Sequence, residues 1–405
     1  MSRGASLQLP DLLALTRDFE LHINPHCRVV SDAVEAWWID PRNATMFAPN
    51  NGEDLRNMKA GLLAALVLPA SDSPQLTLVA HFLTALLYFQ QRMATATSLV
   101  DCGWEHLSES NGLSFLDSNK VFHLFIPHLN RLSSHAPDDW RTRFNASITA
   151  FQFATPSLVS ASGEPTACRD IDTYIRQKMS ASGTRMLIDL MELVKELRLP
   201  SSYFEQSDAM LTSLVETTVC ILTWSLDIVS YNIHQSYGSK TNAINVIVKT
   251  MQLTTQGALK FAHAQLKQQF EQFKLVERAI LDGLASVHAP HHRPQAPRHR
   301  SVSPPGASAP PARTPWSWVP TTLFSSSKPP SPDPSPPKPI FEPDDHWDEQ
   351  TCDDMRAYMQ GLRDCIVGFV HWTYETDIYF GKHGEEVRNT GWMFMLPPVC
   401  STKRS

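Results

Sequence analysis

Apolar residues recur at intervals of three and four along most of this chain, and this spacing constrains its fold more than any other feature. It runs through residues 183–199, 207–235 and 241–284, while residues 76–102 begin almost wholly apolar. Such intervals place apolar side chains on one face of an α-helix, whereas a half-buried strand needs alternation. Alternating runs bounded by hairpin turns are missing from the sequence. We therefore predict an all-α fold of about ten helices, with the helix at 76–102 in its centre.

A proline-rich stretch interrupts the helical pattern. Of the 30 prolines, 17 lie between Pro290 and Pro343. Proline lacks a backbone donor and the stretch has little apolar surface to bury, so we expect a disordered insert at 289–344. The insert would separate residues 1–288 from residues 345–400, which complete the same domain. It could be a spacer, it could dock a partner, or it could come from an intron retained in the gene sequence; these alternatives stay open.

Charge and cysteine content exclude several classes of protein. The formal net charge of −6 argues against a nucleic-acid partner. No run of about 18 apolar residues is found, so no membrane span is expected. The seven cysteines are scattered and form neither a disulfide framework nor a CxxC zinc pattern. The chain also begins without a signal-like region, and we expect a cytoplasmic protein with reduced thiols.

Three sequence blocks, in order along the chain, carry a family resemblance. NPH stands at 24–26 and is followed by Trp38; LDIVSYNIHQ occupies 226–235; GLRDCIVGFVHWTYETDIYFGKHG occupies 361–384. These blocks resemble the NPH, NDIxSYNxEQ and WSFE…RYFG blocks of fungal class I terpene synthases, in particular basidiomycete sesquiterpene cyclases. The resemblance spans nearly the whole chain apart from the insert. It implies a single all-α domain built around an apolar cavity.

The resemblance also implies a chemistry. Such cyclases form an allylic cation by expelling diphosphate from a prenyl substrate such as farnesyl diphosphate. Mg²⁺ neutralises the leaving group and is held by an aspartate-rich DDxxD helix and by Asn, Ser and Glu at i, i+4 and i+8. The second spacing puts three oxygens on one helical face. Basic side chains assist at the diphosphate.

The metal-ligand positions of this sequence depart from that pattern. The positions that match the family's ligands are Gln90, Gln91, Leu226, Ser230 and His234. Only Ser230 keeps a ligand as in the family, and imidazole is a poor partner for Mg²⁺, which prefers hard oxygens. A literal DDxxD at 344–348 lies downstream of Ser230, whereas the family's motif lies well upstream, so we interpret it as a solvated helix start.

The diphosphate-binding positions are mixed. They fall on Lys178, Ile378 and Tyr379, with Arg92 as a further candidate. Lys178 keeps the charge of the family's arginine but loses its two-pronged geometry, and Ile378 removes a cation.

The sequence supports three hypotheses. The leading one is a sesquiterpene synthase-like protein that has lost Mg²⁺ binding and is a pseudoenzyme. The second is a noncanonical cyclase that still ionises farnesyl diphosphate, with Arg92, Lys178, His234 and Tyr379 binding the diphosphate directly. The third is a non-catalytic isoprenoid-binding or scaffold protein, in which the insert docks a partner.

Overall fold

The computed structural model divides the chain into two units. One unit comprises Met1–Leu281 and Asp348–Ser405, and the other comprises Asp282–Trp347. The residues that the structure describes are 6–44, 51–95, 112–119, 121–161, 170–205, 210–239, 241–287 and 349–399. The predicted insert at 289–344 and the DDxxD motif at 344–348 lie outside the described residues. Nearly all of the helices and both strands belong to the first unit.

The all-α prediction is confirmed, because helices make up nearly all of the regular structure. The α-helices are α1 (Cys27–Ile39), α2 (Pro41–Ala44), α3 (Asn51–Met58), α4 (Ala60–Val67), α5 (Ser73–Thr95), α6 (Leu113–Ser118), α7 (Ile126–Ser133), α8 (Asp138–Ala161), α9 (Ile171–Ala181), α10 (Thr184–Val194), α11 (Ser202–Glu205), α12 (Met210–Ser236), α13 (Ala243–Met251), α14 (Thr255–Val287), α15 (Glu349–Glu375), α16 (Asp377–Phe380) and α17 (Gly384–Thr390). Short 3₁₀ helices are η1 (Leu13–Thr16), η3 (Phe122–Leu124) and η5 (Gly381–His383).

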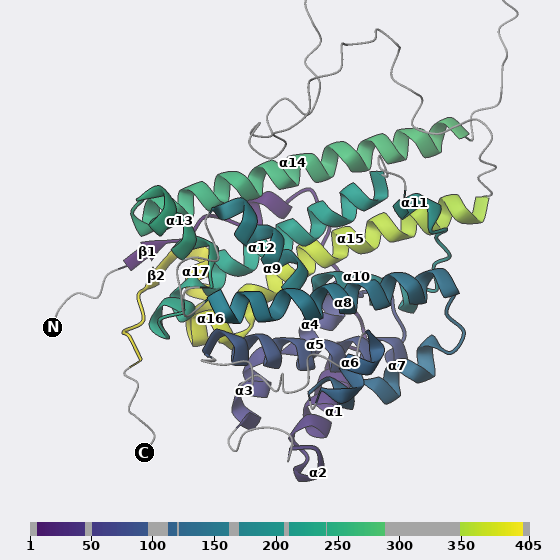
Figure 1. Ribbon diagram of the computed structural model, residues 1–405, viewed down its shortest axis with the longest axis horizontal. Helices are drawn as coiled ribbons and strands as arrows, with labels where there is room; N and C mark the ends of the chain where they lie inside the picture. The colour runs from purple at the N-terminus through teal and green to yellow at the C-terminus, as the bar shows by residue number, and fades with distance from the viewer. Residues whose placement is uncertain are drawn as a thin grey trace, which may run out of the picture. The chain divides into compact units, whose positions relative to one another are not determined.

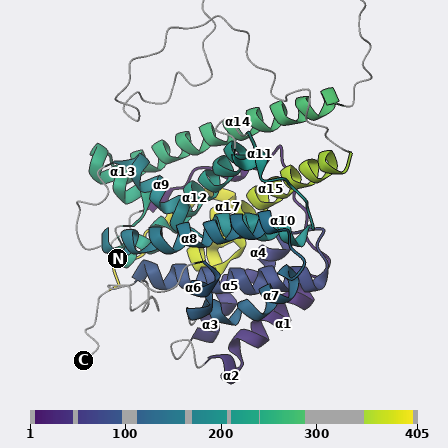
Figure 2. The same ribbon diagram turned by 45° about the vertical axis from the view of Figure 1, so that its right-hand side comes forward.

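Two long helices, α12 and α15, form the centre of the first unit (Figure 1). α12 packs against α9, α10, α13 and α15, and α15 also packs against α4. α5 lies against α4 and α10, and its apolar stretch from Leu76 to Phe89 is largely buried, as the sequence predicts. Figure 2 shows α5, α8 and α10 running side by side across the turned view. Burial of these apolar faces supplies the main stabilisation of the fold.

Local sequence signals set several helix ends. Asp72 and Gln75 form a reciprocal capping pair at the start of α5, each accepting the other's backbone N–H. The segment with helical spacing at 241–284 forms two helices, because Gln252 adopts a left-handed backbone (φ 55°) that ends α13 before α14 begins. The apolar spacing did not predict this break, because the same three- and four-residue spacing continues through both helices.

One helix among the described residues, α12, is long and apolar enough to cross a membrane. Its apolar window is 78% buried inside the fold. This degree of burial is typical of a core helix, and the packing of α12 against α9, α10, α11, α13, α15 and α16 agrees with that role.

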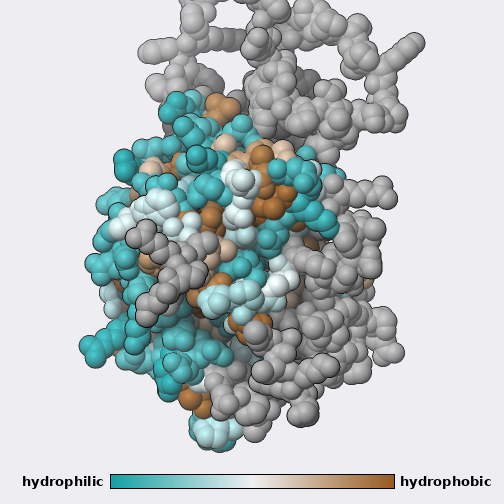
Figure 3. All heavy atoms as spheres, turned by 90° about the vertical axis from the view of Figure 1, so that its left-hand side faces the viewer, coloured by the Kyte–Doolittle hydropathy of each residue, from teal (hydrophilic) through white to brown (hydrophobic). Residues whose placement is uncertain are grey.

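The sequence analysis missed a small antiparallel sheet. β1 (Ser6–Gln8) pairs with β2 (Trp392–Phe394), with Leu7 opposite Met393. Leu7 and Met393 are buried, whereas Trp392 and Phe394 face outward. Figure 3 views this side of the unit, where apolar residues form small groups among hydrophilic ones. Each strand spans only three residues, too few for an alternating pattern to be read.

Candidate functional site

One cavity of about 580 Å³ opens between the ends of α5, α9, α12 and α16. Its size lies within the range of roughly 300–1,000 Å³ that is common for small-molecule pockets. Every position that the sequence analysis singled out as a site residue lines this cavity: Gln90, Gln91, Arg92, Lys178, Leu226, Ser230, His234, Ile378 and Tyr379. The structure therefore brings together residues from four helices that are far apart in sequence.

Apolar and aromatic side chains line much of the cavity. Leu87 and Tyr88 come from α5, Leu158 from α8 and Ile233 from α12. Tyr379 is buried at one wall, where its ring meets Trp372 edge-on with centroids 5.9 Å apart. These walls can hold a hydrocarbon chain, while polar side chains line a similar share of the cavity.

The end of α5 is fixed by close packing against the turn between α9 and α10. Gly183 has a left-handed backbone (φ 71°), and a Cβ added there would lie 2.5 Å from Leu86 Cδ1. This close approach lets Gln90 Nε2 donate a hydrogen bond to the Ser182 carbonyl over 2.6 Å. A carboxylate at position 90 could not donate this bond, so Gln90 has a structural role that aspartate would not fill.

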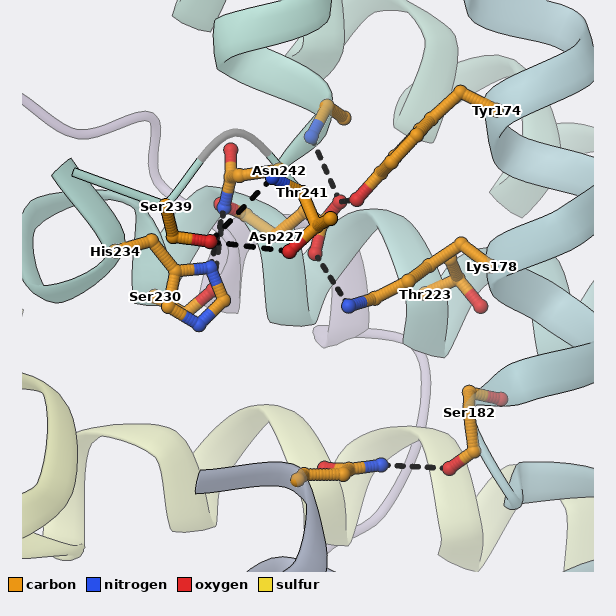
Figure 4. Close-up of polar contacts among 12 residues, drawn as sticks. Tyr174, Lys178, Ser182, Thr223, Asp227, Ser230, His234, Ser239, Thr241 and Asn242 are labelled. Atoms are coloured by element: carbon orange, nitrogen blue, oxygen red, sulfur yellow. Dashed lines mark hydrogen bonds and ion pairs between the residues drawn. The ribbon is translucent and has the colours of Figure 1, made fainter. Parts of the chain in front are cut away.

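The polar end of the cavity is built around Asp227, which is fully buried on α12 (Figure 4). Its Oδ2 accepts hydrogen bonds from the Tyr174 hydroxyl (2.7 Å) and from the Ala243 N–H (2.8 Å). Its Oδ1 lies 3.8 Å from Lys178 Nζ. Burial raises the pKa of Asp227, while the Lys178 ammonium and the two donors oppose this shift. The two charges of the pair offset one another.

Asn242 links this carboxylate to His234. Asn242 Oδ1 accepts the Ile244 N–H at the start of α13, which fixes the orientation of the amide. Its Nδ2 then lies 2.8 Å from the Asp227 carbonyl, 3.3 Å from Ser230 Oγ and 3.3 Å from His234 Nδ1. One Nδ2 proton goes to the Asp227 carbonyl, and the other is shared between Ser230 Oγ and His234 Nδ1. Because an amide nitrogen can only donate, this contact assigns Nδ1 as the accepting nitrogen and places the ring proton on Nε2.

His234 is uncharged in this setting. Burial and the nearby Lys178 ammonium lower the pKa of His234 to about 3. His234 is a lining residue of the cavity, and its neutral ring carries the proton on Nε2. Nδ1 is the ring nitrogen that is hydrogen-bonded to Asn242 (Figure 4).

The mouth carries two carboxylates that the sequence analysis did not identify. Asp54 on α3 and Asp377 on α16 both line the cavity, together with Asn57. Lys59 Nζ lies 3.3 Å from Asp377 Oδ2 and also donates to the Glu375 carbonyl. No short sequence pattern joins these residues, because they meet only when α16 folds against α3.

Known proteins resemble this chain over most of its length. The family described as "Terpene synthase family 2, C-terminal metal binding" matches residues 90–272. Sesquiterpene synthase Agr1 of Cyclocybe aegerita is 25% identical over 96% of this chain and 93% of its own length. Wild-type cucumene synthase superposes with a TM-score of 0.59 at 17% identity, covering 88% of this chain and 99% of that chain. Hedycaryol synthase in complex with nerolidol gives 0.58 at 14% identity, covering 87% and 96%.

The chain resembles class I terpene synthases in its fold, in the family match over residues 90–272 and in full-length relatives that are 25% identical or less. The fold likeness and the sequence relatives agree with the three sequence blocks. Residues of the first block have structural roles: the buried Asn24 donates to the carbonyls of Leu68 and Ser71, and Trp38 Nε1 donates to His81 Nδ1.

Members of this terpene synthase family have a metal-binding domain, so the donor set at the cavity matters. Within the described residues, no group of three or more Asp, Glu, His or Cys side chains is placed to hold a metal ion. Residues 96–111, which follow α5, are not among them. The polar groups at positions 90, 91, 230 and 234 are amides, a hydroxyl and a neutral imidazole. None of these groups is a carboxylate: the amide and hydroxyl oxygens are uncharged, and imidazole is a poor ligand for Mg²⁺.

Proposed function

We propose that this chain is a terpene synthase homologue that holds an isoprenoid in the retained cavity without Mg²⁺-driven loss of diphosphate. The observation that carries the proposal is that two positions matching the family's metal ligands, Gln90 and His234, form hydrogen bonds within the protein. Gln90 donates to a carbonyl, and His234 is neutral with Nδ1 bound to an amide. An ionised carboxylate at position 90 could not donate the Gln90 bond, and the neutral imidazole at position 234 brings no negative charge to a metal.

The carboxylates at the mouth do not supply a substitute in this proposal. Asp377 is already paired with Lys59, and Asp54 is exposed. Mg²⁺ at such a site would have to compete with the lysine ammonium for the same oxygens. Without metal, ionisation loses several kcal/mol of charge stabilisation, and each 1.4 kcal/mol lowers the rate about tenfold.

Binding of an isoprenoid is supported by the cavity walls and by a relative's ligand. Leu87, Tyr88 and Leu158 give the cavity an apolar side. A protein of the same fold, hedycaryol synthase, has been seen in complex with nerolidol, a sesquiterpene alcohol. The cytoplasmic location and the docking of a partner by residues 289–344 belong to this proposal as expectations from the sequence.

The test is incubation of the purified full chain with farnesyl diphosphate, with and without Mg²⁺. We expect saturable quenching of tryptophan fluorescence, no hydrocarbon product and no release of diphosphate above the buffer rate. A combined variant, Gln90→Asp, Gln91→Asp, Leu226→Asn and His234→Glu, is the matched comparison, because it restores the family's ligand types. A Mg²⁺-dependent hydrocarbon from the unmodified chain would contradict the proposal.

A noncanonical cyclase is the second candidate, and one observation favours it. Arg92, Lys178, His234 and Tyr379 line the same cavity, so two cations and two neutral donors could face one diphosphate. This candidate requires a hydrocarbon product without Mg²⁺. It also requires that Arg92→Gln lowers product formation by tenfold or more.

A further inference from the structure

The charged side chains that line the cavity balance one another. Among the lining residues that the structure describes, Arg92 and Lys178 are the cations, and Asp54 and Asp377 are the carboxylates. Lys178 also faces the buried Asp227, and Asp377 also faces Lys59. A diphosphate, with about three negative charges, would therefore lose its hydration against lining charges that sum to zero among the described residues.

Hydrogen-bond donors nevertheless point into the polar end. The proton of His234 sits on Nε2, because Nδ1 accepts from Asn242, and His234 is a lining residue. Figure 4 shows the His234 ring on the opposite side of the polar end from Lys178. No hydrogen bond from Nε2 to another described residue is made. The Lys178 ammonium has three protons and meets Asp227 at only 3.8 Å, which leaves it able to donate elsewhere.

A site with donors and no net charge suits one kind of ligand. A ligand oxygen without charge, as in an alcohol, ether or ketone, can accept from Nε2–H without a charge to compensate. A pure hydrocarbon would instead cover this N–H and leave it unpaired, which is unfavourable in a desolvated pocket.

The geometry points to an uncharged, oxygenated isoprenoid as the ligand of this cavity, with its oxygen accepting a hydrogen bond from His234 Nε2–H. This inference rests on the proposed function, since it names the ligand class of the same pocket. In it His234 is a specificity-determining residue, and Asn242 is the positioning residue that selects its tautomer. The low pKa of His234 keeps the ring in this form throughout the neutral pH range.

Calorimetric titration of the full chain with four probes of one carbon skeleton tests the inference. The probes are farnesol, farnesyl methyl ether, β-farnesene and farnesyl diphosphate, all without added metal. We expect the alcohol and the ether to bind within about threefold of each other, because both offer an accepting oxygen. The hydrocarbon should bind about tenfold more weakly, and the diphosphate more weakly than the alcohol.

Variants separate the role of the imidazole from that of pocket shape. His234→Leu should bring farnesol down to the affinity of the hydrocarbon, and His234→Gln, which keeps an N–H donor, should recover part of the difference. His263→Leu is the matched control, since His263 is also half-buried on a helix but does not line the cavity. If His234→Leu fails to fold, the affinities of farnesyl methyl ether and β-farnesene for the unmodified chain still test whether the cavity prefers a ligand with an accepting oxygen.

The outcomes distinguish this inference from the proposed function. Equal affinity for farnesol and β-farnesene, or tighter binding of the diphosphate, overturns the ligand class while leaving isoprenoid binding intact. Absence of binding by every probe, or Mg²⁺-dependent turnover of farnesyl diphosphate, overturns the proposed function itself.

Discussion

Two buried polar clusters of this molecule differ in what surrounds them: one borders a cavity and the other is packed within the protein. The pocket cluster comprises Lys178, Asp227 and His234 at the cavity, and the distal cluster pairs Arg143 of α8 with Glu192 of α10. In the pocket cluster, the side that lacks protein partners faces a space that a ligand can enter. The distal cluster is enclosed by protein.

The distal cluster contains polar atoms that nothing satisfies. Glu192 Oε2 and the Tyr358 hydroxyl are buried without a hydrogen-bond partner. Burial raises the pKa of Glu192 to about 7, although the Arg143 guanidinium opposes the shift. Burial thus favours the neutral form of a group in both regions, but only at the cavity does that group bear on binding. In the distal cluster it bears on stability.

The largest effect is expected from breaking the distal cluster. Glu192→Ala leaves the Arg143 guanidinium, which is 11% exposed, without its partner. Removing one member of a buried ion pair typically costs about 3–5 kcal/mol, so the free energy of unfolding at pH 8 should fall by that amount. Urea unfolding measures it, with the exposed Glu385→Ala as control. A loss below about 1 kcal/mol would show that the pair behaves like one on the surface.

The pH dependence of the free energy of unfolding tests the contribution of the distal cluster to stability. Glu192 binds its proton more tightly in the folded chain, with a pKa of about 7 against an ordinary value of 4.5. Between these values the folded state carries more protons, so this residue makes the free energy of unfolding decrease as pH rises from 4.5 to 7. The contribution is roughly 2–3 kcal/mol. Comparison with Glu192→Gln isolates it, and identical slopes in the two proteins would refute it.

The smallest effect is expected in the pocket cluster. Lys178→Met leaves Asp227 with its two donors, Tyr174 and the Ala243 N–H, and the raised pKa of Asp227 allows it to take up a proton. We expect a loss of about 1–2 kcal/mol in the free energy of unfolding, measured by urea as before. A loss equal to that of Glu192→Ala would mean that the two clusters do not differ.

Helical spacing and motif register together predicted much of this arrangement. The apolar periodicity located α5, α10 and α12, and the family register placed Gln90, Lys178 and His234, which line one cavity. Both signals are local: each depends on residues within a few turns of one helix. What these residues do chemically, or whether they have lost their chemistry, remains a prediction.

The parts that escaped prediction depend on contacts between distant segments. Asp54 and Asp377 meet at the mouth although more than three hundred residues separate them. The tautomer of His234 depends on Asn242, which caps the next helix and carries no catalytic signature. Such partners depend on packing and capping geometry, which spacing along one helix does not encode.

α15 comes from the far side of the proline-rich stretch, yet it packs against α4 and α12 of the earlier part of the chain. β2, also from the far side, pairs with β1 near the N-terminus. The two stretches of this unit are thus held by burial and hydrogen bonding as well as by the covalent link. A protease cut within 289–344 would therefore yield a nicked protein whose two fragments stay associated and keep the pocket between them.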